Sequence, residues 1–322
     1  MYNMAEFKKR VYGCAIVKAI NSNYNADFSG QPRTLPDGIV YATDKAFKYS
    51  IKRYLKDAYE NVDIFYMKTL NDNMNPRSLN ERYECLFRAK PNDETKKDVV
   101  KNLLSCLDVK LFGATFASGN TSVSVHGPVQ INHGTNIWKD NYIYSEQITS
   151  PFRNEASNKA SNKASNTGKD PDTERGMTTI GRQSRLEEGH YLHHFSVNPG
   201  NLDDISNIVG EGVKLSDADI DKLKVGMRRG VTWYDSASKA GCENEMLVWV
   251  ELKEGSKLVL PNFATLINLE EEKENGKCVY DFETLTNKLE DIKSSVESVE
   301  VYYNKQTCIL KNLAEEVKLY DI

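Results

Sequence analysis

Three histidines close together in the sequence carry the side chains best suited to metal chemistry. His190, His193 and His194 form an H-x-x-H-H pattern, and histidine is the commonest metal ligand in proteins. The surrounding apolar residues predict a strand, in which His190 and His194 point to one face and His193 to the other. Three ligands on one ion would need a helix or a turn. We therefore interpret these histidines as structural or RNA-stacking residues, and expect no metal.

Two aspartates lie in the loop that follows the first predicted strand. Asp27 or Asp37, placed beside a nucleic-acid groove, can assist phosphodiester hydrolysis with a bound metal. Such a residue more often caps a turn or orients an arginine, and no partner acid is evident. The sequence also lacks a P-loop, a G-x-G-x-x-G after a strand and a G-x-S-x-G elbow. We therefore expect no catalytic residue and no cofactor.

A predicted helix that begins near Thr43, a good N-cap residue, carries two stripes of side chains. One stripe is apolar: Phe47, Ile51, Tyr54, Leu55 and Ala58. Beside it lies a basic stripe: Lys45, Lys48, Lys52 and Lys56. A basic stripe next to a buried one lies at the rim of a sheet, and the helix N-terminus adds a positive dipole end. The pattern suits a bound polyanion, although taken alone a solvated lysine face is the commoner explanation.

Aromatic residues alternate with basic ones in several segments, as they do in proteins that bind single-stranded nucleic acids. These segments include Tyr24, Phe28 and Arg33, and then Arg228, Arg229, Trp233 and Tyr234. The other explanation is that the aromatic side chains belong to the core. We accept it for Phe47 and Trp249. We assign Tyr24 and Phe28, in an asparagine-rich loop, to the stacking group.

The order of predicted elements is β-α, then hairpin strands, then β-α-β, with long insertions. Residues 11–20 read as a central strand buried on both faces, because apolar residues run on without clean alternation. Residues 61–107 form an insertion with helical spacing. Residues 135–188 read as a protruding hairpin, with a low-complexity loop at 156–170 that contains an A-S-N-K repeat. The pattern predicts one α+β domain, 1–322, with an RRM-like or ferredoxin-like antiparallel sheet and helices on one face.

Composition places the chain among ordinary soluble proteins. It has 322 residues, 39% of them hydrophobic, and a net charge of −4, and no apolar run approaches a membrane span. The polar N-terminus has no signal-peptide core, and the six cysteines form no C-x-x-C pair, so we expect a reducing cytoplasm. Residues 251–322 hold nine lysines against 15 acidic residues, a balance of −6. Any nucleic acid should therefore bind the first 250 residues.

Several motifs, in the right order, resemble one known family. Near the N-terminus these are N-S-N-Y-N-A-D at 21–27, Q-P-R-T at 31–34 and the spacing of 43–52. Later ones are L-F-G at 111–113, V-H-G-P-V-Q at 125–130, S-P-F-R at 150–153, G-R-Q-S-R at 181–185 and H-Y-L-H-H-F at 190–195. Together they resemble the CRISPR-associated backbone subunits of type I surveillance complexes (Cascade), most closely the Csh branch of type I-B systems, in the Cas-seven group of the RAMP superfamily. The resemblance covers most of residues 8–235.

The resemblance implies a hand-shaped protein with an RRM-like palm, a helical finger at 61–107 and a hairpin thumb at 135–188. Copies would line up along a CRISPR guide RNA (crRNA) as a helical oligomer, beside other Cascade subunits. Target DNA would then pair with the guide, while the protein holds the backbone. The implied role lies in antiviral defence and maintenance of CRISPR repeat elements.

The resemblance also implies which residues act, by matching positions in the motifs. The implied RNA-binding residues are Asn21, Asn23, Arg33, Lys45, Lys48, Lys52, Arg228 and Arg229. The implied thumb residues, which would wedge between bases, are Ile148, Phe152, Thr179, Ile180 and Arg182. A second hypothesis is a metal-dependent ribonuclease, like type III relatives that use a loop aspartate, with Asp27 as the candidate. A third is a generic single-strand RNA chaperone.

Overall fold

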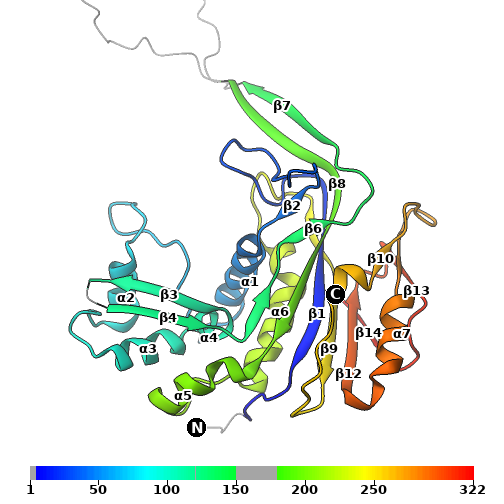
Figure 1. Cartoon of the computed structure of the whole chain (residues 1–322). Coiled ribbons are helices and arrows are strands. Elements are labelled where there is room, and N and C mark those ends of the chain that lie inside the picture. The colour runs from blue at the N-terminus through cyan, green and yellow to red at the C-terminus, as the bar shows by residue number, and fades with distance from the viewer. Residues whose placement is uncertain (1–4, 120, 150–179) are drawn as a thin grey trace, which may run out of the picture.

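The computed structural model describes residues 5–119, 121–149 and 180–322 and is built around one large sheet (Figure 1). Within the described residues, this sheet has nine strands in the order β14-β12-β9-β1-β8-β6-β2, and β5 and β7 also pair with β8. The strands are β1 (Val11–Ser22), β2 (Tyr41–Ala42), β5 (Val129–Ile131), β6 (Gly134–Asn136), β7 (Ile143–Thr149), β8 (Ile180–Val197), β9 (Cys242–Leu252), β12 (Val296–Tyr303) and β14 (Lys318–Asp321). Most neighbours are antiparallel, whereas β12 and β14 run parallel.

Strand β1 lies at the centre of the sheet, as its apolar run predicts. It pairs antiparallel with β8, where Val17 lies opposite Tyr191, and with β9, where Cys14 lies opposite Val248. Its residues are buried from Val11 to Val17. Ile16 packs into the hydrophobic cluster on one face and Val17 into the cluster on the other. The prediction of a strand buried on both faces is confirmed.

Two helices, α1 (Asp44–Ala58) and α6 (Asp217–Trp233), pack against each other and cover one face of the sheet. The Thr43 side chain caps α1 by accepting a hydrogen bond from the backbone of Ala46, as predicted. Ser216 and Asp219 form a capping box at the start of α6. Helix α6 continues past Arg229 to Trp233.

The opposite face is also covered, which corrects the expectation that the sheet has helices on one face only. A small sheet with the order β10-β11-β13 and helix α7 pack there and form the second hydrophobic cluster. Its elements are η2 (Phe263–Thr265), β10 (Asn268–Leu269), β11 (Cys278–Asp281), α7 (Glu283–Asp291), η3 (Lys293–Ser295) and β13 (Cys308–Lys311). The physical reason is that β1 and β9 present apolar side chains on both faces, and both need cover.

A third hydrophobic cluster lies at the side of the sheet, where Figure 1 shows the cyan and green elements together. Its elements are α2 (Leu79–Phe87), α3 (Lys96–Ser105), α4 (Leu107–Phe112), β3 (Gly113–Ser118), β4 (Thr121–His126), η1 (Pro199–Leu202) and α5 (Asp203–Val209). The cluster joins Tyr83 and Leu103 to Phe116 and Val125, and also to Leu202. This packing unit therefore extends past the sequence-based boundary at residue 107.

Strands β7 and β8 form a hairpin that projects from the body of the protein (Figure 1). Its register runs from Ile143 opposite Leu186 to Thr149 opposite Ile180. The low-complexity loop at 156–170, together with Phe152 and Thr179, lies outside the described residues. Beyond residue 186, β8 continues into the large sheet as the neighbour of β1. One strand therefore belongs both to the hairpin and to the core.

Candidate nucleic-acid interface

Asn21 connects the end of β1 to the base of the β7–β8 hairpin. Its backbone is in the left-handed region, with φ 45°, which asparagine tolerates better than most residues. Its side-chain oxygen accepts a hydrogen bond from the Tyr144 hydroxyl at 3.1 Å, and its carbonyl accepts one from the Arg185 guanidinium at 2.7 Å. Asn21 is exposed, so it remains reachable at the junction of two elements.

Asn23 and Arg33 shape the loop after β1. Asn23 is buried, and its side-chain amide donates to the carbonyls of Gly30 and Ser184 at 3.1 and 3.2 Å. Arg33 is half-buried, and its Nε donates to the carbonyl of Ala26 at 3.1 Å. Both side chains therefore hold the loop in place, and Asn23 is too deeply buried to bind a ligand without a rearrangement.

The two loop aspartates cap turns. The Asp27 carboxylate accepts hydrogen bonds from the backbone and hydroxyl of Ser29, both at 2.8 Å, and from the backbone of Gln31 at 3.0 Å. These bonds, led by the Ser29 hydroxyl, lower the pKa of Asp27. Asp37 accepts from the backbone of Ile39 at 3.2 Å. Both residues therefore cap turns, which is the commoner role of an aspartate in a loop.

The lysines of α1 have different environments. Lys45 is exposed. Lys48 forms an ion pair with Asp44 at 3.0 Å, and its ammonium lies 5.5 Å from the centre of the Phe112 ring. Burial opposes the ionised Asp44 carboxyl, but the Lys48 hydrogen bond and charge outweigh it and lower the pKa of Asp44. Lys45 is therefore the more available of these two cations.

Lys52 of α1 contacts the insertion that contains Tyr66 and Asp108. Its side chain is only 15% exposed, and its ammonium lies 3.6 Å from the carboxylate of Asp108 and 3.3 Å from the Tyr66 carbonyl. Asp108 also accepts the backbone N–H groups of Phe65 and Tyr66 at 2.7 and 2.9 Å. Burial lowers the pKa of Lys52 despite the attraction of Asp108. The packing gives Lys52 a structural partner, and its contact with RNA remains a prediction.

The basic pair of α6 lies away from the α1 lysines. The Arg228 guanidinium lies over the Tyr302 ring at 4.3 Å, on β12, whereas Lys48 and Lys52 contact the α4 side. Figure 1 shows α4 and β12 on opposite sides of the helix pair. Arg229 is exposed. The sequence-predicted cations therefore fall on at least two surfaces.

Two hairpin residues predicted to contact RNA are exposed. Ile148 is 48% exposed and lies opposite Gly181, which has no side chain to cover it. Arg182 is exposed and lies opposite Gln147. Ile180 pairs with the last residue of β7 through its backbone. The two exposed residues give the hairpin an apolar side chain on one face and a cation on the other.

The structure confirms three of the four assignments of aromatic residues to the core or to an exposed position. Phe47 and Trp249 are fully buried and Phe28 is fully exposed, as predicted. The assignment of Tyr24 to an exposed stacking group is wrong. Tyr24 is fully buried, and its ring packs against Tyr191 at 5.1 Å. The loop turns back into the core at this point, so its polar composition misled the prediction.

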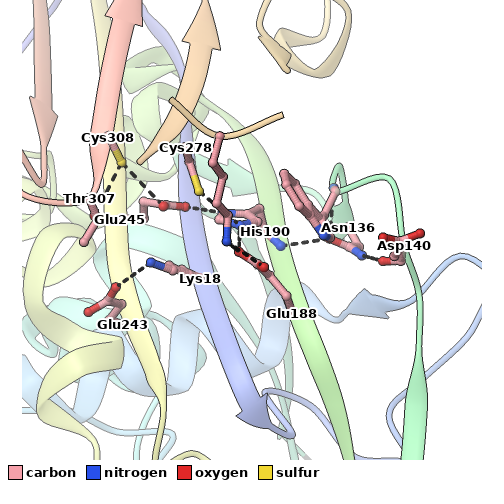
Figure 2. A network of polar contacts seen from close by, with 12 residues as sticks. Lys18, Asn136, Asp140, Glu188, His190, Glu243, Glu245, Cys278, Thr307 and Cys308 are labelled. Carbon is pink, nitrogen blue, oxygen red and sulfur yellow. Dashed lines mark hydrogen bonds and ion pairs between the residues drawn. The ribbon is translucent and has the colours of Figure 1, made fainter. Parts of the chain in front are cut away.

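The three histidines alternate between the faces of β8, as predicted. His193 faces α1, where its ring stacks on Phe47 at 4.8 Å, while its Nδ1 donates to the Asn132 carbonyl at 3.0 Å. His190 and His194 face the small sheet, where His194 stacks near Phe263 at 5.7 Å. His190 is fully buried in the polar network of Figure 2. The two fully buried rings, His190 and His193, act within the core.

An open groove of about 530 Å³ lies beside the start of α1, and the sequence analysis did not predict it. Its lining includes Asp44, Asn132, His133, His194 and Asn262. His133 is exposed and lies 5.5 Å from the ring of Tyr41. Residues from several separate segments form this groove, so no local sequence pattern predicts it.

Comparison with known families identifies the chain. The family model for CRISPR-associated protein Cas7 matches residues 9–291. The chain belongs to the Cas7 family. Among curated proteins, no match was found. Within the part of the chain that the structure describes, no helix has the length and apolar character needed to cross a membrane.

Solved structures agree with this Cas7 assignment in fold. The chain is similar to one described as "CRISPR RNA-guided surveillance complex, pre-nicking", with 13% identity and a TM-score of 0.57, covering 97% of this chain and 96% of that one. A second, described as "CRISPR RNA-guided surveillance complex", has 12% identity and a TM-score of 0.50, covering 96% and 95%. At such low identity the likeness supports a shared fold across nearly the whole Cas7 chain.

Proposed function

We propose that this Cas7-family protein is a non-catalytic backbone subunit of a type I CRISPR surveillance complex. In this role it binds crRNA along its length as a helical oligomer and presents the guide for pairing with target DNA. The observation that carries the proposal is the family match over residues 9–291. The motifs at 21–52 and 181–195 favour the Csh branch of type I-B. The partners would be crRNA, further copies of the chain and other Cascade subunits, in the cytoplasm.

The strand order supports the hand-shaped interpretation of the fold. Strands β9, β1, β8 and β6 are adjacent in that order, with α1 after β1 and α6 between β8 and β9. A ferredoxin-like β-α-β-β-α-β chain orders its strands 4-1-3-2, which is the same arrangement. On this basis the large sheet is the palm, the third cluster is the finger and the β7–β8 hairpin is the thumb.

The exposed groups at the start of α1 and along the β7–β8 hairpin support a phosphate-binding surface there. Asn21 joins β1 to the hairpin, Arg182 is exposed on the hairpin, and Lys45 is exposed in the first turn of α1. The Asn25 side chain accepts hydrogen bonds from Thr43 at 2.9 Å, which connects the loop after β1 to the start of α1. We propose that the RNA backbone lies across this surface, with Lys45 and Arg182 as its main cations.

A paired charge reversal tests this surface. Lys45→Glu with Arg182→Glu should weaken guide binding for every guide sequence alike. It should also reduce the slope of log affinity against log salt by about 1.4, since each lost phosphate contact on a single strand removes about 0.7. The matched control is Lys253→Glu with Lys257→Glu, two exposed lysines beyond β9. Equal binding by the test and control variants at several salt concentrations would overturn the surface.

Purification and cleavage assays test the function itself. We expect host RNA to co-purify in a large assembly that ribonuclease breaks down, seen by the absorbance ratio at 260 and 280 nm and by size exclusion. A monomer that ignores added guide RNA would refute the proposal. An assembled filament given complementary RNA and Mg²⁺ should leave that RNA uncut. Regular cleavage that Asp27→Ala abolishes would replace the proposal with the ribonuclease hypothesis.

A further inference from the structure

A cluster of a partly exposed carboxylate, a buried imidazole and a buried thiol lies between the large and the small sheet, on the face away from α1. Glu188 and His190 are two residues apart on β8 and therefore point to the same face. Cys278 begins β11 of the small sheet, which packs over that face. Figure 2 shows Glu188 and Cys278 on either side of the His190 ring.

We propose that Glu188, His190 and Cys278 bind one Zn²⁺ ion, which fastens the base of the hairpin strand β8 to the C-terminal small sheet. The three ligand atoms all lie within 4.8 Å of one another. The His190 Nε2 atom is 3.2 Å from a Glu188 oxygen and 3.7 Å from the Cys278 sulfur. Tetrahedral zinc with bonds of about 2.0–2.3 Å separates its ligand atoms by about 3.3–3.8 Å. These two separations therefore already fit.

The second nitrogen of His190 has the partner that zinc-binding histidines have. Its Nδ1 lies 2.5 Å from a carboxylate oxygen of Glu245, which is fully buried. Glu245 also accepts the Tyr280 hydroxyl at 2.7 Å and the Cys308 thiol at 3.4 Å. A carboxylate on the far nitrogen fixes the tautomer and turns the lone pair of Nε2 toward the metal. Here that lone pair points between Glu188 and Cys278.

The backbone and the neighbouring ring hold His190 in this orientation. Its N–H donates to the Asn136 side chain at 2.8 Å, and Asn136 in turn donates to the Asp140 carbonyl at 3.0 Å. The Trp138 ring lies 5.5 Å from the imidazole. The ligand is therefore positioned by groups from β6 and the loop after it, before any metal binds.

The Glu188 carboxylate also forms an ion pair with Lys273. The Lys273 ammonium lies 2.7 and 2.8 Å from the two Glu188 oxygens, and the Glu188 side chain is 17% exposed. Zinc binding displaces this ammonium to solvent and leaves room for a water. The Cys278 thiol and the Nε2 atom of the protonated His190 ring each release a proton to solvent when they bind. The carboxylate and the thiolate then balance the charge of the dication.

The same residues without zinc form a chain of ion pairs, Lys273–Glu188–His190–Glu245. That chain does not use the Cys278 thiol, which nonetheless lies against His190 Nε2. A borderline-soft set of sulfur, nitrogen and oxygen ligands favours zinc over magnesium or calcium. The two explanations differ in whether Cys278 and Lys273 influence metal binding.

Metal titration of the full-length chain tests the proposal. After treatment with a chelator and reloading, we expect one equivalent of Zn²⁺ per chain by elemental analysis. With Co²⁺ in its place we expect a thiolate-to-metal charge-transfer band. Cys278→Ser should remove that band and lower zinc affinity by more than the 10–100-fold typical of an outer-shell change. The matched control is Cys106→Ser, a buried cysteine in the third hydrophobic cluster, which should keep both metal and band.

Lys273→Ala provides a test that does not depend on disturbing the core. Lys273 is partly exposed and competes with the metal for Glu188, so its removal should raise zinc affinity. Less than a tenth of an equivalent of zinc on the reloaded wild type, or no charge-transfer band with Co²⁺, would overturn the proposal. Unchanged zinc binding in Cys278→Ser, or lower affinity in Lys273→Ala, would do the same and leave the ion-pair chain as the explanation.

Discussion

Gly230 of α6 lies directly against the backbone of Ser50 in α1. A Cβ atom at position 230 would come within 2.8 Å of the Ser50 carbonyl oxygen and 3.0 Å of the Ile51 nitrogen. One turn earlier, a Cβ at Gly226 would meet the Ile51 side chain at 2.9 Å. The two helices can pack this closely only because α6 has glycine at both positions.

We expect Gly230→Ala to destabilise the protein by about 1–2 kcal/mol. Alanine gains about 1 kcal/mol in helix propensity, but the backbone of α1 cannot move aside, and overpacking costs about 1–3 kcal/mol or more. Gly226→Ala is the matched comparison and should cost less, because it meets a side-chain tip. Urea unfolding of both variants measures the difference. A Gly230→Ala variant as stable as wild type would contradict the packing argument.

Within the Lys52–Asp108 ion pair, replacing Asp108 should destabilise the protein more than replacing Lys52. Asp108→Ala should cost about 3 kcal/mol or more, since it leaves one buried and one partly buried backbone N–H group and the Lys52 ammonium without their partner. Lys52→Met leaves both N–H bonds of Asp108 intact, so we expect about 1–2 kcal/mol. Thermal or urea unfolding at neutral pH gives both values.

The same lysine variant tests the RNA-binding role predicted for Lys52. If the ammonium serves Asp108, Lys52→Met should reduce stability while the folded protein keeps most of its affinity for guide RNA. Lys45→Met, at an exposed position on the same helix, should do the opposite. A Lys52→Met protein with full stability and weak RNA binding would restore the phosphate contact that the family motif implies.

The buried His193 should make the protein less stable in mild acid. Burial lowers the pKa of His193 to about 4 from an ordinary value of 6.5, so below pH 6.5 the unfolded chain binds a proton that the folded chain excludes. The stability from the neutral ring is complete above pH 6.5 and falls until about pH 4. Between pH 7.5 and pH 5 the loss should be about 2 kcal/mol.

Urea unfolding across this pH range, on wild type and His193→Gln, measures the contribution of that one ring. The variant starts less stable at pH 7.5, because it loses the stacking on Phe47. Its stability should then depend less on pH, by about 2 kcal/mol over the interval. Parallel curves for the two proteins would show that the ring titrates normally in the folded state.

The sequence predicts elements well where the signal is local. The central strand, the capped helix after Thr43 and the alternation of His190 and His193 all follow from spacing, and each is confirmed. The second covered face of the sheet was missed. It depends on a small sheet that pairs β11 with β13 in parallel, across α7 and β12, and no local pattern reports such pairing.

The environment of a polar side chain was predicted poorly when its partner lies far away in the sequence. Lys52 belongs to a stripe that looks solvent-exposed, but Asp108, 56 positions later, buries its ammonium. Tyr24 lies in a polar loop, but Tyr191 and His193 pack against it. His190 meets Cys278 across 88 positions. In each case the tertiary contact, which the sequence does not show, decides the chemistry.

Replacing the exposed isoleucine of the hairpin should impair RNA-dependent assembly without changing the stability of the folded monomer. Ile148 is 48% exposed opposite Gly181, so Ile148→Ser should change stability by no more than about 0.5 kcal/mol. A wedge between bases needs an apolar side chain, and we therefore expect smaller assemblies on guide RNA by size exclusion. Ile208→Ser, at a 67% exposed site on α5, is the control and should assemble like wild type. Equal assembly by both variants would remove Ile148 from the RNA-contacting surface and leave Arg182 as the hairpin's described contribution.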